Sequence, residues 1–365
     1  MNLLAWLLSV GAVAGLVFIA VLTVDGVRVL MERLRRERAA RPLDLVVTAR
    51  QEVAGHLVCL QLRRRWGRRL PAYMPGQYVV LSAPLGPGGR EVRRAYSLAA
   101  WQAGRPKAYE LGIKREPQGL MSSWVWDALR PGQRVRVLPP KGDFVLQPAS
   151  GERVLIGAGI GITPMRAMLH AALSEPGRVL VFHAARHEDE LLYREEFERL
   201  AARFPTFHYL PTVSRPGTDW SGARGRLDAA GIIEHLLHPA AAQFYLCASD
   251  AVMASLTAGF EAAGILPSAI HREAFGAALG AGGSGQNVDL PGGKRVVTAG
   301  EPSLLHALEA AGCAPPSECR AGSCGLCRMQ LLGGEVRWGL APGCELQRGE
   351  ILPCICQAVS DLRLA

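Results

Sequence analysis

Cysteine is scarce over the first 312 residues of this 365-residue chain, where Cys59 and Cys247 stand alone. The other seven cysteines fall between Cys313 and Cys356. This distribution excludes a disulfide scaffold, which spreads its cysteines through a small secreted chain. Clustered thiols in a chain long enough for two or three domains instead predict a metal centre and a reducing compartment.

Lysine is also scarce: the chain has four lysines against a Lys and Arg total of 41, so its net charge of +9 depends on arginine. No nucleic-acid-binding motif accompanies this charge, and we expect no nucleic acid partner. The run RRRWGRR, from Arg63 to Arg69, is either a solvated surface or a docking patch for an acidic partner. The sequence also lacks an internal repeat and any catalytic triad, metallohydrolase or kinase motif.

Charge is absent from Leu3 to Val24, a run of 22 residues. At about 1.5 Å per residue, a helix of this length spans a hydrocarbon core of roughly 30 Å. The run lacks the basic segment that precedes a cleaved signal peptide. We therefore expect a transmembrane anchor over residues 1–25, with a cleaved signal or a buried helix as the alternatives. The arginine-rich linker over 26–42 predicts that the remaining chain lies on the cytoplasmic side of the membrane.

Three patterns follow the linker. Short alternating apolar runs over 43–148, with one helical insert, predict an antiparallel β-barrel. Continuous apolar strands alternate with helices over 149–275, one of them expected at 189–204, and predict a doubly wound parallel sheet. A Gly-rich linker over 276–286 leads to an α+β segment over 287–365 that carries the cysteine cluster.

The cluster reads CRAGSCGLC, with Cys319, Cys324 and Cys327 spaced C-x4-C-x2-C. This is the plant-type [2Fe–2S] spacing, which a distant fourth cysteine completes. Spacing alone leaves Cys344, Cys354 and Cys356 as candidates for the fourth ligand. A structural zinc site is the alternative, although zinc favours paired C-x2-C knuckles and the sequence has one such pair.

The segment ILPCICQAVSDLRLA resembles the closing strand of plant-type ferredoxins, which form a β-grasp fold. In that family the ligand lies seven residues before the Asp of a Ser-Asp pair. Ser360 and Asp361 match that pair, so the resemblance selects Cys354.

Three motifs occur in order in the first predicted domain: PGQY (75–78), RAYSL (94–98) and GLMSSW (119–124). This trio resembles the flavin domain of the ferredoxin–NADP reductase superfamily. The resemblance implies that Arg94 pairs with the flavin phosphate, that Tyr96 packs on the flavin, and that Ser97 lies near its reactive nitrogen. It also assigns Leu98 to the flavin motif and Gly119, Met121 and Ser122 to a pyrophosphate site at a helix start, which favours FAD over FMN.

The second predicted domain begins with LIGAGIGITPM, a strand, a glycine-rich turn and a helix start. Its glycines let the backbone approach a phosphate-bearing ligand. The pattern GxGxGxTP is similar to the nicotinamide domain of the same superfamily, and it assigns coenzyme contacts to Gly157, Gly159, Gly161, Thr163 and Pro164.

The same resemblance marks further residues. It implies that Cys247 lies near the nicotinamide, although Ala248 and Ser249 replace the usual Gly and Pro. It implies that Ser214 and Arg215, or Arg186, contact the 2′-phosphate of NADPH; NADH is the alternative. In REAF, Glu273 is expected near the flavin nitrogen and Phe275 over its ring.

The domain order resembles fused reductases of the phthalate-dioxygenase-reductase type. That resemblance implies an oxidoreductase that passes electrons from NAD(P)H through FAD and a [2Fe–2S] cluster to an oxygenase, hydroxylase or desaturase. The expected anchor favours a membrane-associated acceptor and a single-pass location at the cytoplasmic membrane. A non-catalytic electron carrier or redox-sensing module is the alternative, favoured by the altered Cys247-Ala248-Ser249.

Overall fold

The computed structural model describes residues 41–116, 119–149, 151–275, 280–313, 315–322, 324–340 and 342–365. Within these ranges, no helix combines the length and apolar character needed to cross a membrane. The expected anchor over residues 1–25 lies outside the described residues, as does most of the basic linker.

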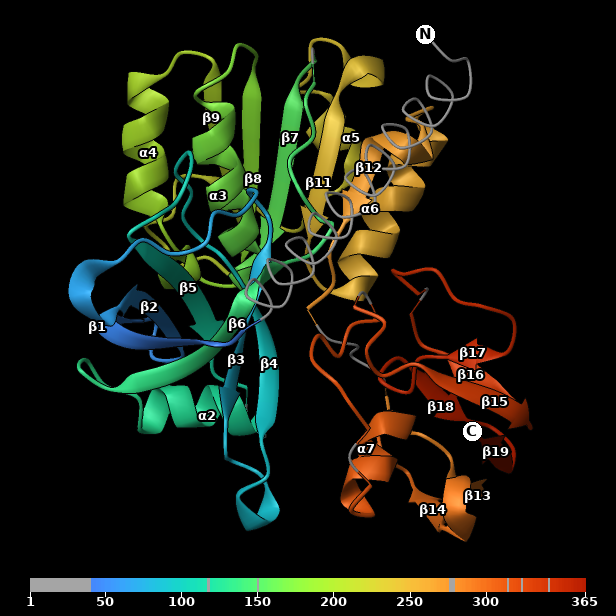
Figure 1. The fold of residues 1–365 in the computed structure, drawn as a ribbon. Helices are drawn as coiled ribbons and strands as arrows, with labels where there is room; N and C mark the ends of the chain where they lie inside the picture. Colours follow the sequence, from blue (N-terminus) through green and yellow to red (C-terminus); the bar gives the residue numbers. More distant parts are fainter. Residues whose placement is uncertain are drawn as a thin grey trace, which may run out of the picture. The chain divides into compact units, whose positions relative to one another are not determined.

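The first part of the described chain is an antiparallel sheet with the strand order β4-β3-β6-β1-β2-β5 (Figure 1). A bridge between Leu98 and Leu111 connects the end of the β4 segment to β5, so the sheet curls toward closure. Buried and exposed residues alternate at the start of β1, as expected for a sheet with one face on a core. The elements are β1 (Leu43–Val53), β2 (Leu57–Arg64), β3 (Tyr78–Ala83), β4 (Val92–Ser97), β5 (Ala108–Lys114), α2 (Leu120–Asp127) and β6 (Arg134–Lys141).

The second part is a parallel sheet with the strand order β10-β9-β8-β7-β11-β12. The chain order reverses between β7 and β11, and ligands of doubly wound sheets bind at such a switch point. The elements are β7 (Arg153–Ala158), α3 (Ile162–Ala172), β8 (Val179–Ala185), α4 (Arg194–Arg203), β9 (Phe207–Val213), β10 (Ala223–Arg224), α5 (Ala229–Ile233), β11 (Gln243–Cys247), α6 (Asp250–Ala262) and β12 (Ile270–Arg272).

Alternate residues of β7 face opposite sides of this sheet. Leu155 packs in a core with residues of α3 and α4, whereas Val154 and Ile156 pack in a second core with α5 and α6. Figure 1 shows α3 and α4 on one face of the sheet and α6 on the other. The continuous apolar strands of this segment therefore reflect burial on both faces.

The helix expected over 189–204 is shorter in the structure. α4 begins at Arg194, because Tyr193 has a left-handed backbone with φ of 63° and interrupts the helical pattern. Residues Glu188–Glu190 form a separate 3-10 turn. Pattern alone did not predict this break, since Tyr is not a residue that usually adopts positive φ.

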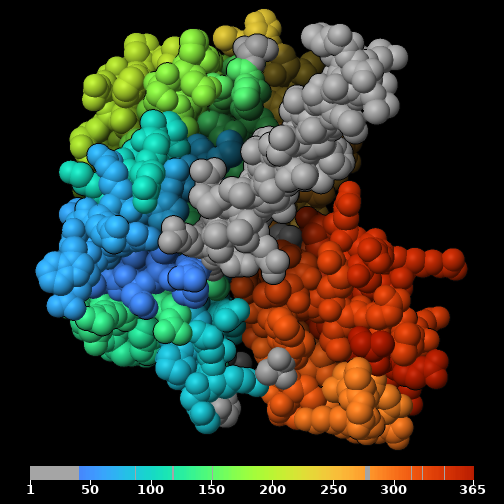
Figure 2. Space-filling view, in the orientation of Figure 1, coloured from blue at the N-terminus to red at the C-terminus, as the bar shows by residue number. Residues whose placement is uncertain are grey.

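The last part forms one compact body, orange to red in Figure 2. Its sheets have the orders β14-β13-β19-β15-β17 and β16-β18, with α7 packed against them. The Ser360-Asp361 pair fixes the closing strand: the Asp361 carboxylate accepts hydrogen bonds from Asn287 N (2.7 Å) and Asn287 Nδ2 (3.0 Å). The elements are β13 (Ser284–Asp289), β14 (Arg295–Ala299), α7 (Leu304–Ala310), β15 (Met329–Gly333), β16 (Val336–Trp338), β17 (Glu350–Ile351), β18 (Cys356–Ala358) and β19 (Leu362–Leu364).

Candidate functional site

One cavity of about 250 Å³ brings together residues from all three sequence segments. Ten of the predicted site residues line it: Arg94, Tyr96, Ser97, Gly119, Met121, Ser122, Thr163, Glu273, Phe275 and Cys319. The sequence analysis missed a further eight lining residues: Tyr78, Ala95, Gly112, Lys114, Glu116, Ile160, Ala274 and Arg320. Five of these lie inside the quoted motifs without having been assigned a role, and no sequence signal marked the other three, which are Gly112, Lys114 and Glu116.

The cavity has a cationic end at Arg94. Burial, together with the charge of Arg320, lowers the pKa of Arg94 to about 10. No carboxylate of the described residues forms an ion pair with it; its Nη1 donates to the neighbouring Arg93 carbonyl oxygen (2.7 Å). A half-buried guanidinium that forms no ion pair with a described carboxylate fits a bound phosphate.

The start of α2 lies beside the same cavity. Gly119 is the residue before the helix, and a Cβ there would lie 2.3 Å from Ser122 Oγ. Ser122 Oγ donates to the Gly119 carbonyl oxygen (3.2 Å) and accepts from Glu116 N (3.1 Å). The positive end of the helix dipole and this close backbone turn fit the pyrophosphate of FAD.

The other end of the cavity holds a buried carboxyl group. Ser97 Oγ donates a hydrogen bond to Glu273 Oε2 (3.3 Å), and both side chains are buried. Burial raises the pKa of Glu273 to about 8, although the hydrogen bond from Ser97 partly opposes this. The Glu273 backbone N–H donates to Leu246 O (3.0 Å), which holds the carboxyl group at the end of β11.

The glycine-rich turn connects β7 to α3 at the switch point of the parallel sheet. A Cβ on Gly161 would lie 2.0 Å from the Cys247 carbonyl oxygen, and one on Gly157 would lie 2.7 Å from Ile162 Cα. Gly159 has φ of 54° and faces open space. The turn thus requires glycine for two different reasons, backbone contact and backbone conformation.

The predicted coenzyme residues lie near this turn without lining the cavity. Cys247 is buried, and burial raises the pKa of its thiol well above the usual range. Pro164 is buried in the first turn of α3, where its missing N–H costs no helical hydrogen bond. Leu98 is also fully buried. None of Leu98, Gly157, Gly159, Gly161, Pro164 and Cys247 lines the cavity.

Arg186, Ser214 and Arg215 meet at the ends of β8 and β9. Arg215 N donates to Arg186 O (2.8 Å), and Ser214 N donates to Ala185 O (3.0 Å). All three residues are exposed, and neither arginine forms an ion pair with a carboxylate of the described residues. This arrangement fits a phosphate group, and it lies outside the cavity.

The four predicted cluster ligands form two thiol pairs. Cys327 Sγ lies 3.3 Å from Cys354 Sγ. Cys319 Sγ accepts hydrogen bonds from the backbone N–H groups of Cys324 (3.3 Å) and Ala321 (3.5 Å). Two pairs of soft thiolate donors with backbone N–H groups directed at sulfur fit a [2Fe–2S] cluster.

Glycine conformation shapes the loop that carries these thiols. Gly322 and Gly325 have φ of 75° and 65°, and a Cβ on Gly322 would lie 2.5 Å from Ile355 Cδ1. Taken over the described part of the chain, no three His, Cys, Asp or Glu side chains are grouped so that they could hold a metal ion. The ligand assignment therefore stays a prediction, with the thiol pairs as its geometric support.

The remaining cysteines of the cluster region have different surroundings. Cys356 is fully buried in the core of the last sheet, opposite Trp338. Cys313 packs at the edge of the same core. Cys344 is half-buried against the small core that includes Cys327 and Cys354, and a Cβ on Gly325 would be 3.1 Å from its Sγ.

An ion-pair group holds the cluster loop beside the barrel. Glu318, which precedes Cys319, has 5% of its side chain exposed and pairs with Lys141 of β6 and with Arg93 of β4 (3.8 Å). Cys319 and Arg320 then line the same cavity as Ser97. The first predicted cluster ligand thus lies next to the predicted flavin residues.

Comparisons with known proteins agree with this arrangement. Three family models match: an oxidoreductase FAD-binding domain over 44–146, an oxidoreductase NAD-binding domain over 155–258 and a 2Fe-2S iron-sulfur cluster binding domain over 288–359. These matches confirm the predicted order of the three domain types and the predicted cofactors.

Two curated proteins illustrate the likeness. The chain is 30% identical over 313 residues to the ferredoxin reductase component of 3-ketosteroid-9-alpha-monooxygenase from Mycolicibacterium smegmatis, covering 79% of this chain and 85% of that protein. It is 33% identical over 235 residues to a flavohemoprotein from Burkholderia sp. (strain TH2), covering 64% of this chain and 59% of that protein. The chain spans little more than half the length of the flavohemoproteins that it matches.

Among solved structures, phthalate dioxygenase reductase matches with a TM-score of 0.66 and 23% identity. The match covers 88% of this chain and 97% of that chain. At this identity the likeness concerns the fold alone.

Replacing Cys354 tests the fourth ligand. We expect Cys354→Ser to lose the visible absorption and the electron paramagnetic resonance signal of a reduced [2Fe–2S] cluster, because a hydroxyl is a poor ligand for iron in this centre. The flavin absorption should remain. The matched control is Cys344→Ser, which removes a nearby thiol that lies outside the pairs; if it, rather than Cys354→Ser, loses the cluster, the assignment is wrong.

The buried carboxyl group of Glu273 predicts a pH dependence. Its folded-state pKa of about 8 lies above the ordinary value of 4.5, so the folded protein keeps a proton that the unfolded chain releases. The free energy of unfolding should therefore fall as pH rises from 4.5 to 8. Infrared spectroscopy should show a protonated-carboxyl band that disappears above about pH 8 and is absent in Glu273→Gln.

The matched control for this prediction is Glu116→Gln, because Glu116 lines the same cavity but is exposed. We expect it to retain the band. The midpoint temperature of thermal unfolding, measured between pH 5 and 8, should fall more steeply with pH for the wild type than for Glu273→Gln. Parallel profiles would contradict the buried, protonated state.

Proposed function

Because this chain belongs to the ferredoxin reductase family, with FAD-binding, NAD-binding and 2Fe–2S domains in one polypeptide, we propose that it is the reductase component of an oxygenase-type system. It oxidises NADH or NADPH and delivers the electrons, through FAD and the cluster, to a separate acceptor protein. The observation that carries this proposal is the shared cavity, which Ser97, Thr163 and Cys319 line from three segments of the chain.

The chain's residues have distinct tasks in this proposal. When bound, FAD accepts a hydride and releases electrons singly, and the [2Fe–2S] cluster takes one electron at a time. Arg94 and the start of α2 hold the phosphates of FAD, which fixes its ring at the other end of the cavity. Ser97 and the protonated Glu273 supply neutral hydrogen-bonding groups at that end, and Thr163 positions the start of α3 against it. Hydride transfer itself requires no catalytic base from the protein.

The coenzyme contacts are Gly157, Gly159 and Gly161, with Cys247 beneath the turn. Arg186, Ser214 and Arg215 provide the surface for the adenosine end of the coenzyme. Their two guanidinium groups, which form no ion pair with any described carboxylate, suit the 2′-phosphate of NADPH, and they also suit the pyrophosphate of NADH. The proposal therefore covers both coenzymes.

The acceptor is proposed to be an oxygenase, hydroxylase or desaturase. The name of the M. smegmatis relative states that it is a ferredoxin reductase component of a monooxygenase. The solved neighbour's description refers to electron transfer from pyridine nucleotides to [2Fe-2S]. These names support an oxygenase partner for this chain, without indicating its final substrate.

The proposal includes a membrane anchor formed by residues 1–25, with residues 41–365 on the cytoplasmic side. Its support is the sequence alone: the uncharged run from Leu3 to Val24 is long enough to cross a bilayer, and arginines follow it. The turn from Arg63 to Arg69 adds a cationic surface, on which Trp66 is 82% exposed. Such a surface suits the anionic headgroups of the cytoplasmic leaflet.

Rapid mixing tests the proposed activity. Anaerobic addition of NADH or NADPH to the purified protein should bleach the flavin absorption. This bleaching should be at least as fast as steady-state turnover with cytochrome c, which the reduced protein should then reduce. Cys354→Ser should retain flavin bleaching and lose most of the cytochrome c reduction. A flavin that neither coenzyme bleaches would exclude a reductase and leave the non-catalytic electron carrier.

Fractionation tests the proposed anchor. We expect the full chain to sediment with membranes and to resist extraction by high salt, because apolar insertion is insensitive to ionic strength, and to be released by detergent. A chain that begins at residue 26 retains the arginines and serves as the matched control; salt should release it. Release of the full chain by salt alone would show that charge, rather than insertion, holds it.

A further inference from the structure

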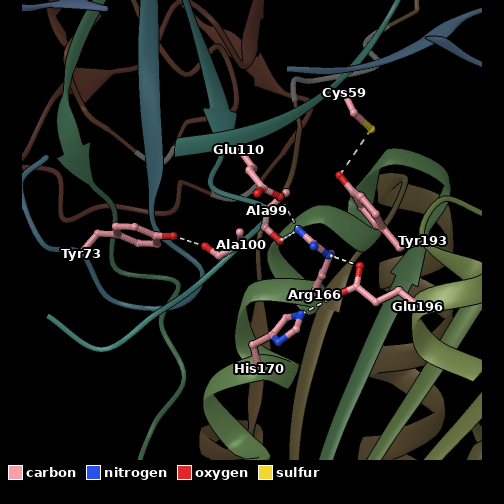
Figure 3. Close-up of polar contacts among 9 residues, drawn as sticks. All are labelled: Cys59, Tyr73, Ala99, Ala100, Glu110, Arg166, His170, Tyr193 and Glu196. Carbon is pink, nitrogen blue, oxygen red and sulfur yellow. Dashed lines mark hydrogen bonds and ion pairs between the residues drawn. The ribbon is translucent and has the colours of Figure 1, made fainter. Parts of the chain in front are cut away.

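A group of half-buried polar side chains outside the cavity connects the barrel to the parallel sheet (Figure 3). Its centre is Arg166, on α3, three residues after Thr163. The guanidinium of Arg166 has contacts on both sides, and its side chain is 14% exposed. None of these contacts is used by the proposed binding of FAD or coenzyme.

The contacts on the barrel side reach the strand that carries the flavin motif. Arg166 Nη1 donates to the Ala99 carbonyl oxygen (3.0 Å) and to Glu110 Oε2 of β5 (2.9 Å). Ala99 follows Ser97 by two residues, and its N–H donates to the Glu110 carbonyl oxygen (2.8 Å). One side chain of α3 therefore holds the two adjacent strand segments beside the flavin residues.

The contacts on the other side fix the direction of the guanidinium. Arg166 Nε donates to Glu196 Oε2 of α4 (2.7 Å), and the second oxygen of Glu196 lies 2.6 Å from His170 Nε2. Burial alone would raise the pKa of Glu196, but the hydrogen bond from His170 and the charge of Arg166 lower it to about 2. The guanidinium also lies over the Tyr193 ring, 4.6 Å from its centre.

Tyr193 extends this group to the cavity wall. Its hydroxyl oxygen accepts a weak hydrogen bond from Cys59 Sγ (3.6 Å), and it would lie 3.3 Å from a Cβ on Gly112. Gly112 lines the cavity, and the same Cβ would lie 2.6 Å from Thr163 Cγ2. A shift of α3 along the barrel would therefore move Thr163 across the cavity wall.

A partly buried ion pair is weak evidence for stability, because desolvation of the charges and screening by solvent offset much of their attraction. Its better-supported effect is to select one geometry among several packed arrangements. Here the geometry in question is the position of α3 relative to β4 and β5. The first turn of α3 is part of the proposed coenzyme site, and β4 and β5 carry the proposed flavin site.

We propose that Arg166 is a positioning residue, which fixes α3 against β5 through Glu110 and Ala99 so that the nicotinamide and the flavin meet at hydride-transfer distance. This inference rests on the proposed function. In the transfer, a C–H bond of the reduced nicotinamide breaks, the hydrogen and both bonding electrons pass to FAD, and the oxidised coenzyme leaves. Arg166 neither gains nor loses a proton or an electron in this step.

Two substitutions test the contact from opposite sides. Arg166→Gln removes the guanidinium, whereas Glu110→Gln removes only the barrel-side carboxylate and leaves the pair between Arg166 and Glu196 intact. We expect both to slow flavin bleaching at saturating coenzyme by about 10- to 100-fold, because a misplacement of about 1 Å can cost a factor of this size. The coenzyme KM should stay close to the wild-type value, since neither residue lies at the coenzyme contacts.

The matched control is Arg178→Gln. This substitution also removes an ion pair with a buried carboxylate, that of Glu152. That pair lies wholly within the parallel-sheet domain, just before β8. We expect its bleaching rate to equal that of the wild type. The double variant Arg166→Gln with Glu110→Gln should be no slower than Arg166→Gln alone, because the two residues act through one contact.

Hydrogen exchange supplies a readout that does not depend on activity. The Ala99 amide should exchange faster in Arg166→Gln and Glu110→Gln than in the wild type, while FAD content stays the same. Protein reduced with dithionite and then freed of the excess, which would itself reduce cytochrome c, should pass electrons to cytochrome c at the wild-type rate in both variants, because the coenzyme takes no part in this transfer.

The inference is overturned if Glu110→Gln bleaches at the wild-type rate, or if Arg178→Gln is slowed as much as Arg166→Gln. Should Arg166→Gln fail to fold, Glu110→Gln decides the matter, since it keeps the pair within the parallel-sheet domain. Failure of the proposed function gives a different result: the wild-type flavin would then not be bleached by either coenzyme.

Discussion

The approach of Gly112 to Thr163 is the constraint on which the site depends. A Cβ at position 112 would lie 2.6 Å from Thr163 Cγ2, so any larger residue would push β5 and α3 apart. Steric contact of this kind sets a minimum separation but no direction. The directional contacts come from Arg166, which bonds to the Glu110 carboxylate in the same strand as Gly112. Together a glycine and a half-buried cation define where the coenzyme turn lies relative to the flavin motif.

Within the cavity, burial disfavours the charged form at both ends, but only one of the two groups becomes neutral at neutral pH. At Arg94 the guanidinium remains charged at neutral pH, because its pKa of about 10 is still high, and it forms no ion pair with a carboxylate in the described part of the chain. At Glu273 the pKa of about 8 leaves the carboxyl group protonated at neutral pH. The cavity thus has one cationic end and one neutral end. This polarity suits a ligand with phosphates on one side and an uncharged ring on the other.

The sequence predicted the parts of the site that recur as motifs with a chemical reason. Arg94, Ser97, Thr163 and Glu273 come from three motifs and line one cavity. It could not predict Gly112 or Lys114, because a single residue inside an ordinary strand carries no signal until its spatial neighbours are known. The fold showed the same limit at Tyr193. Apolar periodicity predicted one long helix there, whereas a left-handed backbone places the Tyr193 ring under Arg166 and starts α4 later.

The fourth cluster ligand shows how a distant contact can decide a local choice. Spacing left three cysteines open, and two of them, Cys354 and Cys356, are only two residues apart. The Asp361 carboxylate binds Asn287, which fixes the closing strand against β13. With that register, Cys356 pairs opposite Trp338 and packs in the sheet core, while Cys354 lies 3.3 Å from Cys327. Because the two cysteines are two residues apart, only a two-residue shift of register would exchange their places, and the Asp361 contact with Asn287 opposes such a shift.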